Sequence, residues 1–240
     1  MSSTPKPFAD RIDALRQSLV VQGALVREMV EHSFDSIFAR DLELARKVIE
    51  SDDEVDRIDL EVEQDAVNIL CDVSKAADGL GADRLRELLV CVKVNNELER
   101  IADAAGVVAE RVIELADRTT PFPESTRVIT NSVIGIVRDA IGAFAGFDAE
   151  RAKVVLRSEG AVLKFSDAIF RSSEQRVADG RMEPDVAFHL HHIVHQCELI
   201  ADHCTNIAEQ VIYAATGAVV RHTGGDWVEI DTPRPDLDTD

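Results

Sequence analysis

Carboxylates spaced four residues apart occur at two corresponding places in the chain. Glu99 is followed by Asp103, and an equivalent pair, Glu198 and Asp202, lies 99 residues further on. Residues with this spacing share one face of a helix, where two like charges destabilise an isolated helix by roughly 0.2–0.5 kcal/mol. Because the arrangement occurs twice, it points to a bound cation that offsets the repulsion. Carboxylate oxygens suit magnesium, manganese and non-haem iron.

Two further groups add to this set of candidate ligands. Asp52 and Asp56 form a third pair within the acidic run ESDDEVDRID, and His195 lies one turn before Glu198 in the run HLHHIVH. An imidazole ligand would extend the choice of metal to zinc. The competing interpretation is a solvated acidic face with surface histidines, which is common on an acidic helical protein, and spacing by itself favours it.

The carboxylate pairs belong to a longer pattern that is present twice. The string ELERIADAAGVVAERVI, which begins at Glu97, is repeated as CELIADHCTNIAEQVI from Cys197. Upstream, DLELARKVIESDDEVDRID from Asp41 is similar to DAERAKVVLRSEGAVLKFSD from Asp148. The prolines of TTPFPES separate the two copies, so the chain is predicted to be a tandem repeat.

Apolar residues recur at intervals of three and four along both copies, which predicts helices and no strands. Glycine, proline and aspartate residues that interrupt this pattern divide the chain into six helical segments, expected at about 8–40, 41–77, 84–117, 124–146, 148–179 and 184–217. We therefore expect an all-α fold made of two tandem homologous three-helix bundles, with bundles at 8–118 and 124–217 and a flexible acidic tail at 221–240.

Composition limits the classes of function. The 240 residues carry a formal net charge of −19, which argues against a nucleic-acid partner because phosphate backbones require a basic surface. No run approaches the roughly 20 uninterrupted apolar residues of a membrane span, and the start MSSTPKPFADRID lacks the apolar centre of a signal peptide. A cytoplasmic location without direct membrane insertion is expected, with the four cysteines reduced and buried.

The paired motif strings ELERIADAA and ELIADHCTNIAEQVIY, followed by VRHTGGD, resemble those of the PhoU family of phosphate-signalling regulators over roughly residues 10–226. The resemblance implies a duplicated three-helix bundle and metal-binding E(D)xxxD motifs. Matched residue by residue, these motifs fall on the three pairs Asp52 with Asp56, Glu99 with Asp103, and Glu198 with Asp202.

The second copy departs from the family pattern. The counterpart of Asp52 is Glu159, but the counterpart of Asp56 is Leu163, which offers no ligand atom. The arginine after the first motif glutamate, Arg100, is replaced by Leu199 in the second copy. A second metal site would therefore be weaker or differently built, with Glu159, His195, Glu198 and Asp202 as its candidate ligands.

The resemblance also implies a function. It describes a non-enzymatic cytoplasmic regulator that docks to the ATPase of the phosphate-specific ABC transporter and to a sensor histidine kinase, restrains phosphate-starvation signalling, and forms a homodimer. The alternative is a helical metal-storage protein or a carboxylate-bridged metalloenzyme, although the Glu-x-x-His motif of ferritin-like sites is absent from the sequence. A third possibility is a helical adaptor without metal.

Overall fold

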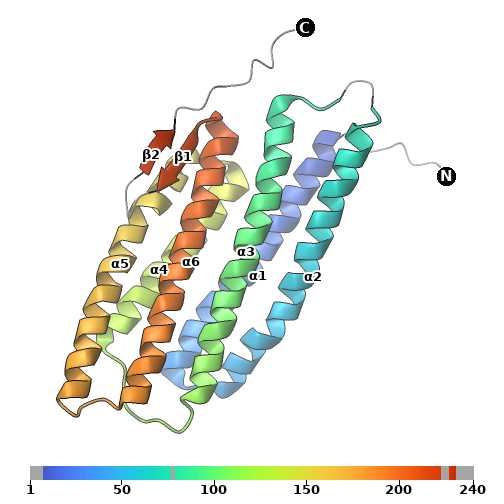
Figure 1. Ribbon diagram of the computed structural model, residues 1–240. Helices are drawn as coiled ribbons and strands as arrows, with labels where there is room; N and C mark the ends of the chain where they lie inside the picture. The colour runs from blue at the N-terminus through green and yellow to red at the C-terminus, as the bar shows by residue number, and fades with distance from the viewer. Residues whose placement is uncertain (1–7, 77–78, 223–226, 231–240) are drawn as a thin grey trace.

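The computed structural model describes residues 8–76, 79–222 and 227–230. Six long helices account for nearly all of them and confirm the predicted all-α architecture (Figure 1). The helices are α1 Phe8–Ala39, α2 Leu42–Val73, α3 Ala82–Glu114, α4 Glu124–Gly146, α5 Ala149–Ala178 and α6 Pro184–Thr216. The largest deviation from the expected boundaries is at the end of α2, which stops short of residue 77.

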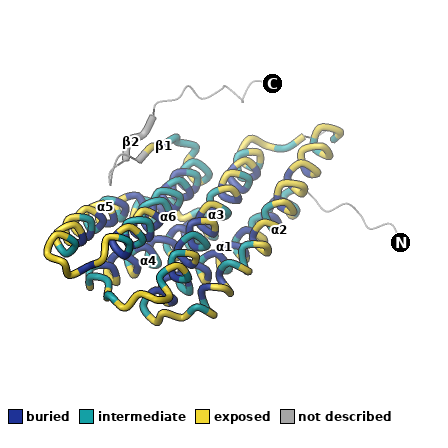
Figure 2. Tube along the Cα trace, turned by 60° about the horizontal axis from the view of Figure 1, so that its bottom comes forward, coloured by how far each residue is buried: buried dark blue, intermediate teal, exposed yellow. Residues whose placement is uncertain are grey.

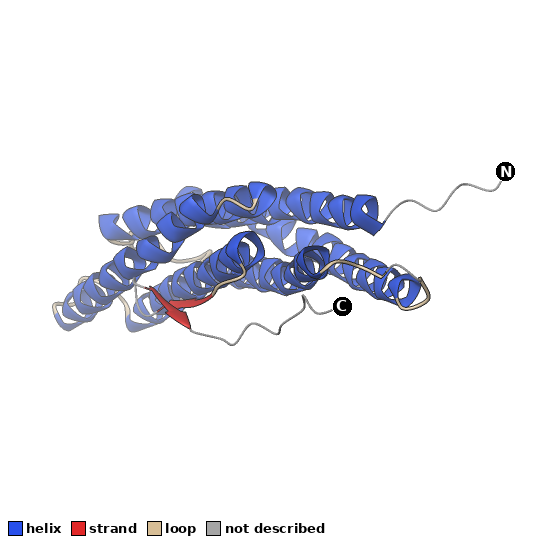
Figure 3. Cartoon of the chain, turned by 90° about the horizontal axis from the view of Figure 1, so that it is seen from above, coloured by secondary structure: helices blue, strands red, loops and turns tan. Residues whose placement is uncertain are grey.

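The helices form two three-helix bundles that are joined along a seam. Helices α1, α2 and α3 pack on one another, and so do α4, α5 and α6. Helix α3 also packs against α6, and α1 against α4, so that α2 and α5 are left at the two flanks of a flattened body (Figure 3). One apolar core cluster extends through both bundles. The two halves therefore share their core.

Helix α1 follows the helical period expected for it. Its predicted stripe is buried throughout, with Ile12, Leu15, Leu19, Val26, Met29 and Val30 all at or below 3% exposure. Gln22 lies in the same stripe and is completely buried. Among the described residues its carboxamide has no hydrogen-bond partner, which is an unfavourable arrangement for a polar group in a core.

Helix α2 buries only some of its apolar residues. Val48, Val55 and Val62 form a buried stripe, but Val67 and Leu70 are 57% and 46% exposed. The buried residues recur every seven positions, so the stripe continues to Ile69 instead. A seven-residue period drifts slowly around an α-helix and leaves the neighbouring apolar residues outside the core.

The same sharp turn joins the first two helices of each bundle. Arg40 and Phe147 adopt left-handed backbone angles, with φ of 54° and 47°. The next residue in each case is an N-cap aspartate, and the side chains of Asp41 and Asp148 each accept a hydrogen bond from a helix amide at 3.0 Å. The left-handed residue reverses the chain and the aspartate begins the next helix. The repeat seen in the sequence is thus a repeat in backbone geometry.

Helices α1 and α4 meet through a matched pair of contacts. The guanidinium of Arg16 on α1 lies 5.0 Å from the ring centroid of Phe147, and that of Arg127 on α4 lies 4.0 Å from the ring centroid of Phe38. Each half therefore places an arginine over an aromatic ring at the end of the other half's first helix. The two contacts add to the packing of α1 on α4.

The end of the chain differs from the expected flexible tail. Strands β1 Val219–His222 and β2 Trp227–Ile230 form an antiparallel hairpin in which Val219 pairs with Ile230. The prediction of a tail from residue 221 is wrong for these strands, which are rich in β-branched and aromatic residues. Residues 223–226 and 231–240 lie outside the described part of the chain.

Three of the four cysteines behave as predicted. Cys91, Cys197 and Cys204 are buried, and burial raises the pKa of the Cys91 thiol to about 12. Burial also raises the pKa of the Cys197 and Cys204 thiols. Cys71 is exposed on α2 and corrects the expectation that all four are buried. The buried thiols remain protonated at neutral pH and serve as small apolar residues.

Helix α4 is the one helix in the described part of the chain with the length and apolar composition to cross a membrane. It packs against α1, α5 and α6, and Ile129, Val133 and Val137 on it are buried. The central helix of a bundle meets the same criteria. The composition of α4 is therefore weak evidence for a membrane span.

Candidate functional site

The predicted carboxylates of the first half come together between α2 and α3. Burial raises the pKa of Asp52, and the negative charges of Asp103 on α3 and Asp56 on its own helix raise it further. The pKa of Glu99 is raised by burial and then by Asp103 and two aspartates of α2. These acids therefore repel one another across the interface of two helices, which the four-residue spacing could not establish.

Asp103 lies at the centre of this acidic face. Its pKa is raised by burial and by Asp56, while the positive charges of Arg100 and His203 act in the opposite direction. Arg100 belongs to the same helix, whereas His203 comes from α6 in the other half. The acidic face thus borders the seam between the bundles.

Asp59 is a member of this face that the sequence analysis missed. Burial raises its pKa, followed by the charges of Glu63 and Asp56. The buried Asn95 of α3 donates to the Asp59 carboxylate at 2.6 Å and to its backbone carbonyl at 3.1 Å. The spacing along the helix could have identified Asp59, because it follows Asp52 by seven residues and Asp56 by three and so lies on the same side of α2.

The chemistry of this face suits a hard cation, because its side chains offer carboxylate oxygens. In the ranges that the structure describes, however, no three histidine, cysteine, aspartate or glutamate side chains converge closely enough to hold a metal ion. Asp52, Asp56, Asp59, Glu99 and Asp103 form an acidic patch rather than a preformed coordination sphere. They could hold a cation only if their side chains moved closer together.

The second half arranges its predicted ligands differently. Glu159 on α5 is only 7% exposed, and on α6 the Nδ1 atom of His195 lies 3.3 Å from Glu198. Leu163, at the position equivalent to Asp56, is 39% exposed. Asp202 follows Glu198 by one turn, as predicted from the sequence. The second half therefore has no carboxylate at the position equivalent to Asp56.

The histidine next to this group has a packing role. The Nε2 atom of His191 lies 2.6 Å from the hydroxyl of Ser173 on α5, and its ring contacts Phe170 edge-on at 4.7 Å between centroids. Burial lowers the pKa of His191, which favours the neutral ring. His191 therefore connects α5 to α6, while His195 is 60% exposed on the outer side.

Polar pairs join the two halves along the α3–α6 seam. The carboxylate of Glu97 on α3 lies 2.8 Å from His203 and accepts from Asn206 at 3.2 Å, both on α6. Near the other end of the seam, Glu114 lies 3.2 Å from His189. The pairs show that the two motif helices run antiparallel. The similarity of the two helices in sequence gives no indication that they pack together.

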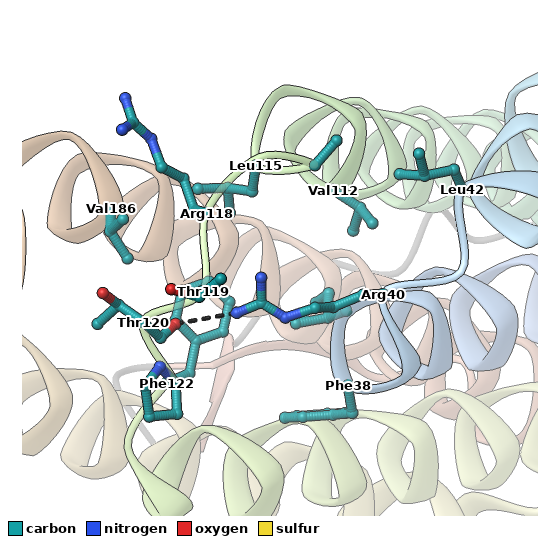
Figure 4. A pocket seen from close by; sticks show the side chains of 13 residues that line it. Phe38, Arg40, Leu42, Val112, Leu115, Arg118, Thr119, Thr120, Phe122 and Val186 are labelled. Carbon is teal, nitrogen blue, oxygen red and sulfur yellow. Dashed lines mark hydrogen bonds between the residues drawn. The ribbon is translucent and has the colours of Figure 1, made fainter.

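An apolar pocket of about 300 Å³ lies at one end of the molecule, where the turn after α1 meets the end of α3 and the linker at 118–122. Arg40 reaches across it and donates to the backbone carbonyl of Thr120 at 3.1 Å, whereas Arg118 points away from it (Figure 4). Its described lining contains no carboxylate or histidine. The pocket is therefore unsuited to a metal ion and is separate from the acidic face.

The fold and the site define this chain as a duplicated three-helix bundle with one acidic motif helix in each half, and comparisons with known proteins agree. The PhoU domain model matches twice, at residues 20–112 and 127–211. The chain belongs to the PhoU family.

Individual relatives match nearly the whole chain. A PhoU homologue of the phosphate-specific transport system from Pseudomonas aeruginosa is 31% identical over 223 residues, covering 90% of this chain and 88% of its own. The accessory protein PhoU of that system from Escherichia coli is 27% identical over 224 residues, covering 92% and 90%.

Solved structures give the same result for the fold. The crystal structure of PhoU from Pseudomonas aeruginosa matches with a TM-score of 0.82 at 28% identity, over 88% of this chain and all of that chain. The PhoU regulatory protein of Streptococcus pneumoniae gives the same TM-score at 20% identity, over 90% of this chain and all of that one, which shows the shared fold.

Proposed function

We propose that this protein is a non-enzymatic cytoplasmic regulator of phosphate uptake and phosphate-starvation signalling. It acts by docking to the ATPase of the phosphate-specific ABC transporter and to a sensor histidine kinase. The observation that carries the proposal is the double match to the PhoU domain, together with relatives that are named as accessory proteins of the phosphate-specific transport system.

Features of the surface support action by docking. The outer face of α2 carries Leu60, Val67 and Leu70, all at least 46% exposed, on a flank of the body (Figure 2). Apolar side chains grouped on an exposed helix are typical of protein interaction surfaces. A partner helix or a second copy of the chain fits such a face, and we propose a homodimer on the same basis.

The test is genetic and biochemical. Deletion of the gene should increase expression of a phosphate-starvation reporter at high phosphate. In a pull-down, the purified protein should retain the transporter ATPase or the cytoplasmic part of the kinase. The variant Leu60→Glu/Val67→Glu should weaken this retention, and Val154→Glu on α5, where Val154 is 50% exposed, is the matched control. A reporter unaffected by deletion, combined with no retention of either partner, would overturn the proposal.

A metal ion on the acidic face of α2 and α3 is the second part of the proposal. Iron, zinc, magnesium and manganese remain the candidates, with Asp52, Asp56, Glu99 and Asp103 as the ligands of the first half. Glu159, His195, Glu198 and Asp202 are the candidates of the second half. The raised pKa values of three of the first four support the first site, because a cation would offset both the burial that chiefly raises them and the repulsion that adds to it.

Metal analysis of natively purified protein and thermal melts with and without chelator test this site. The variant Glu99→Ala/Asp103→Ala should lose bound metal and the chelator-sensitive part of the melting temperature while remaining folded. Unchanged metal content in the variant would contradict the assignment. The alternative of a ferritin-like metalloenzyme or storage protein is less favoured, because the sequence lacks the Glu-x-x-His motif of such sites.

A further inference from the structure

A polar cavity of about 380 Å³, open to solvent, lies between α3 and α6 beside strand β1, at the seam of the two halves. It is separate from the apolar pocket at the linker and from the carboxylates that face α2. Six side chains that can donate hydrogen bonds line it: Lys93, Asn96 and Arg100 from α3, Asn206 and Gln210 from α6, and Arg221 from β1.

The two carboxylates in the lining already have cationic or amide partners. Glu97 is held by His203 at 2.8 Å and by Asn206 at 3.2 Å. Glu209, which is 4% exposed, accepts from the guanidinium of Arg221 at 2.9 Å. Much of the acceptor capacity of the cavity is therefore in use within the protein, and the unused groups are predominantly donors.

The cations of α3 are the clearest unused groups. Lys93 and Arg100 are exposed, and neither takes part in a hydrogen bond or a close ion pair within the described residues. Arg100 acts only at longer range on Glu99 and Asp103, where its charge opposes the rise in their pKa. In a chain with a net charge of −19, a lining with three cations and only two carboxylates is unusually basic.

We propose that this cavity binds a tetrahedral oxyanion, either inorganic phosphate or the phosphate group of a small ester. Arginine and lysine with carboxamide donors supply the charge-assisted hydrogen bonds that phosphate oxygens accept. The bound anion would contact α3, α6 and β1 together, and so would stiffen the seam between the two halves. Binding is argued from the cavity, whereas its use to read the phosphate level rests on the proposed function.

The test is calorimetric titration of the full chain, stripped of metal, with inorganic phosphate and separately with AMP at constant ionic strength. Stripping prevents a metal on the neighbouring acidic face from binding the anion. The variant Lys93→Gln/Arg100→Gln should bind at least about tenfold more weakly, because each lost cation removes a charge-assisted hydrogen bond. The control Lys47→Gln/Arg157→Gln removes the same charge from exposed positions on α2 and α5, and should bind as the wild type does.

Saturable binding of inorganic phosphate would identify the free ion as ligand, and saturable binding of AMP alone would identify a phosphate ester. No saturable heat from either ligand would overturn the proposal, as would equal weakening in both double variants. Deletion of the gene with the starvation reporter tests the proposed function separately. If the protein regulates the reporter but binds neither ligand, the oxyanion proposal is wrong and the proposed regulatory function is retained.

Discussion

The carboxylates at the α2–α3 interface oppose folding at neutral pH when no cation is bound. The pKa values of Asp52, Asp59, Glu99 and Asp103 are all raised, mainly by burial. The folded state therefore binds more protons than the unfolded state as pH rises above the ordinary pKa values of 3.8 and 4.5. These groups lower the free energy of unfolding over that interval, in contrast to a carboxylate whose pKa is depressed by an ion pair.

The variant Asp103→Asn tests this interpretation. In metal-free protein at pH 7 it should raise the free energy of unfolding by less than about 1 kcal/mol, since Asp103 is exposed and solvent screens the repulsion. The gain should shrink as pH falls towards 4, where the aspartate becomes protonated. Chemical denaturation at several pH values measures it. The exposed Asp35→Asn serves as control, and a loss of stability at every pH would contradict the argument.

Gln22 offers a second test at the level of a single residue. Its carboxamide is completely buried and has no partner among the described residues. The substitution Gln22→Leu keeps a similar volume and removes the desolvated polar group, so it should raise the free energy of unfolding by about 1 kcal/mol. Thermal melts of the two proteins measure the change. A clear destabilisation would indicate that the carboxamide is hydrogen-bonded in solution.

At the level of the elements, the repeat is most exact in the turns that join the first two helices of each half. Arg40 and Phe147 are both left-handed without being glycine, and both precede an N-cap aspartate. The amide after each left-handed residue donates back to a carbonyl of the preceding helix, at 3.1 Å from Asp41 and 2.9 Å from Asp148. Two halves with little identical sequence thus retain one capping geometry.

Asp41→Ala and Asp148→Ala should each lower the free energy of unfolding by about 1 kcal/mol, because each removes the acceptor for an unpaired helix amide. Equal losses would show that the two turns are energetically equivalent. Asp65→Ala, at an exposed position inside α2, is the control and should change stability by less than about 0.5 kcal/mol. A loss at Asp65 as large as at the caps would refute the capping explanation.

For the whole molecule, the α3–α6 seam and the common core couple the two halves. Glu97 is bound by two residues of the other half, and α1 and α4 exchange arginine–aromatic contacts. A ligand or partner that acts on one bundle therefore acts on packing that the other bundle also uses. This coupling is a physical basis on which a regulatory protein could transmit a binding event from one half to the other.

Glu97→Ala should lower the free energy of unfolding by about 1–2 kcal/mol, since it leaves His203 and Asn206 without their partner. The variant should still unfold in one transition, because both halves share a core. Circular dichroism and scanning calorimetry should report the same midpoint. Two separate transitions, of which only one moves, would show that the bundles are independent.

The sequence by itself determined the six helices, their duplication and the N-cap aspartates, because helical period and capping depend on residues close together in the chain. It also placed each acidic pair on one helix face. Tertiary packing decided which faces meet: it brought Asp59 into the acidic patch, directed His191 to Ser173, and set α3 against α6 to form the oxyanion cavity. Those contacts depend on the rotation and register of neighbouring helices. Rotation and register follow from how the whole core packs, and no local pattern encodes them.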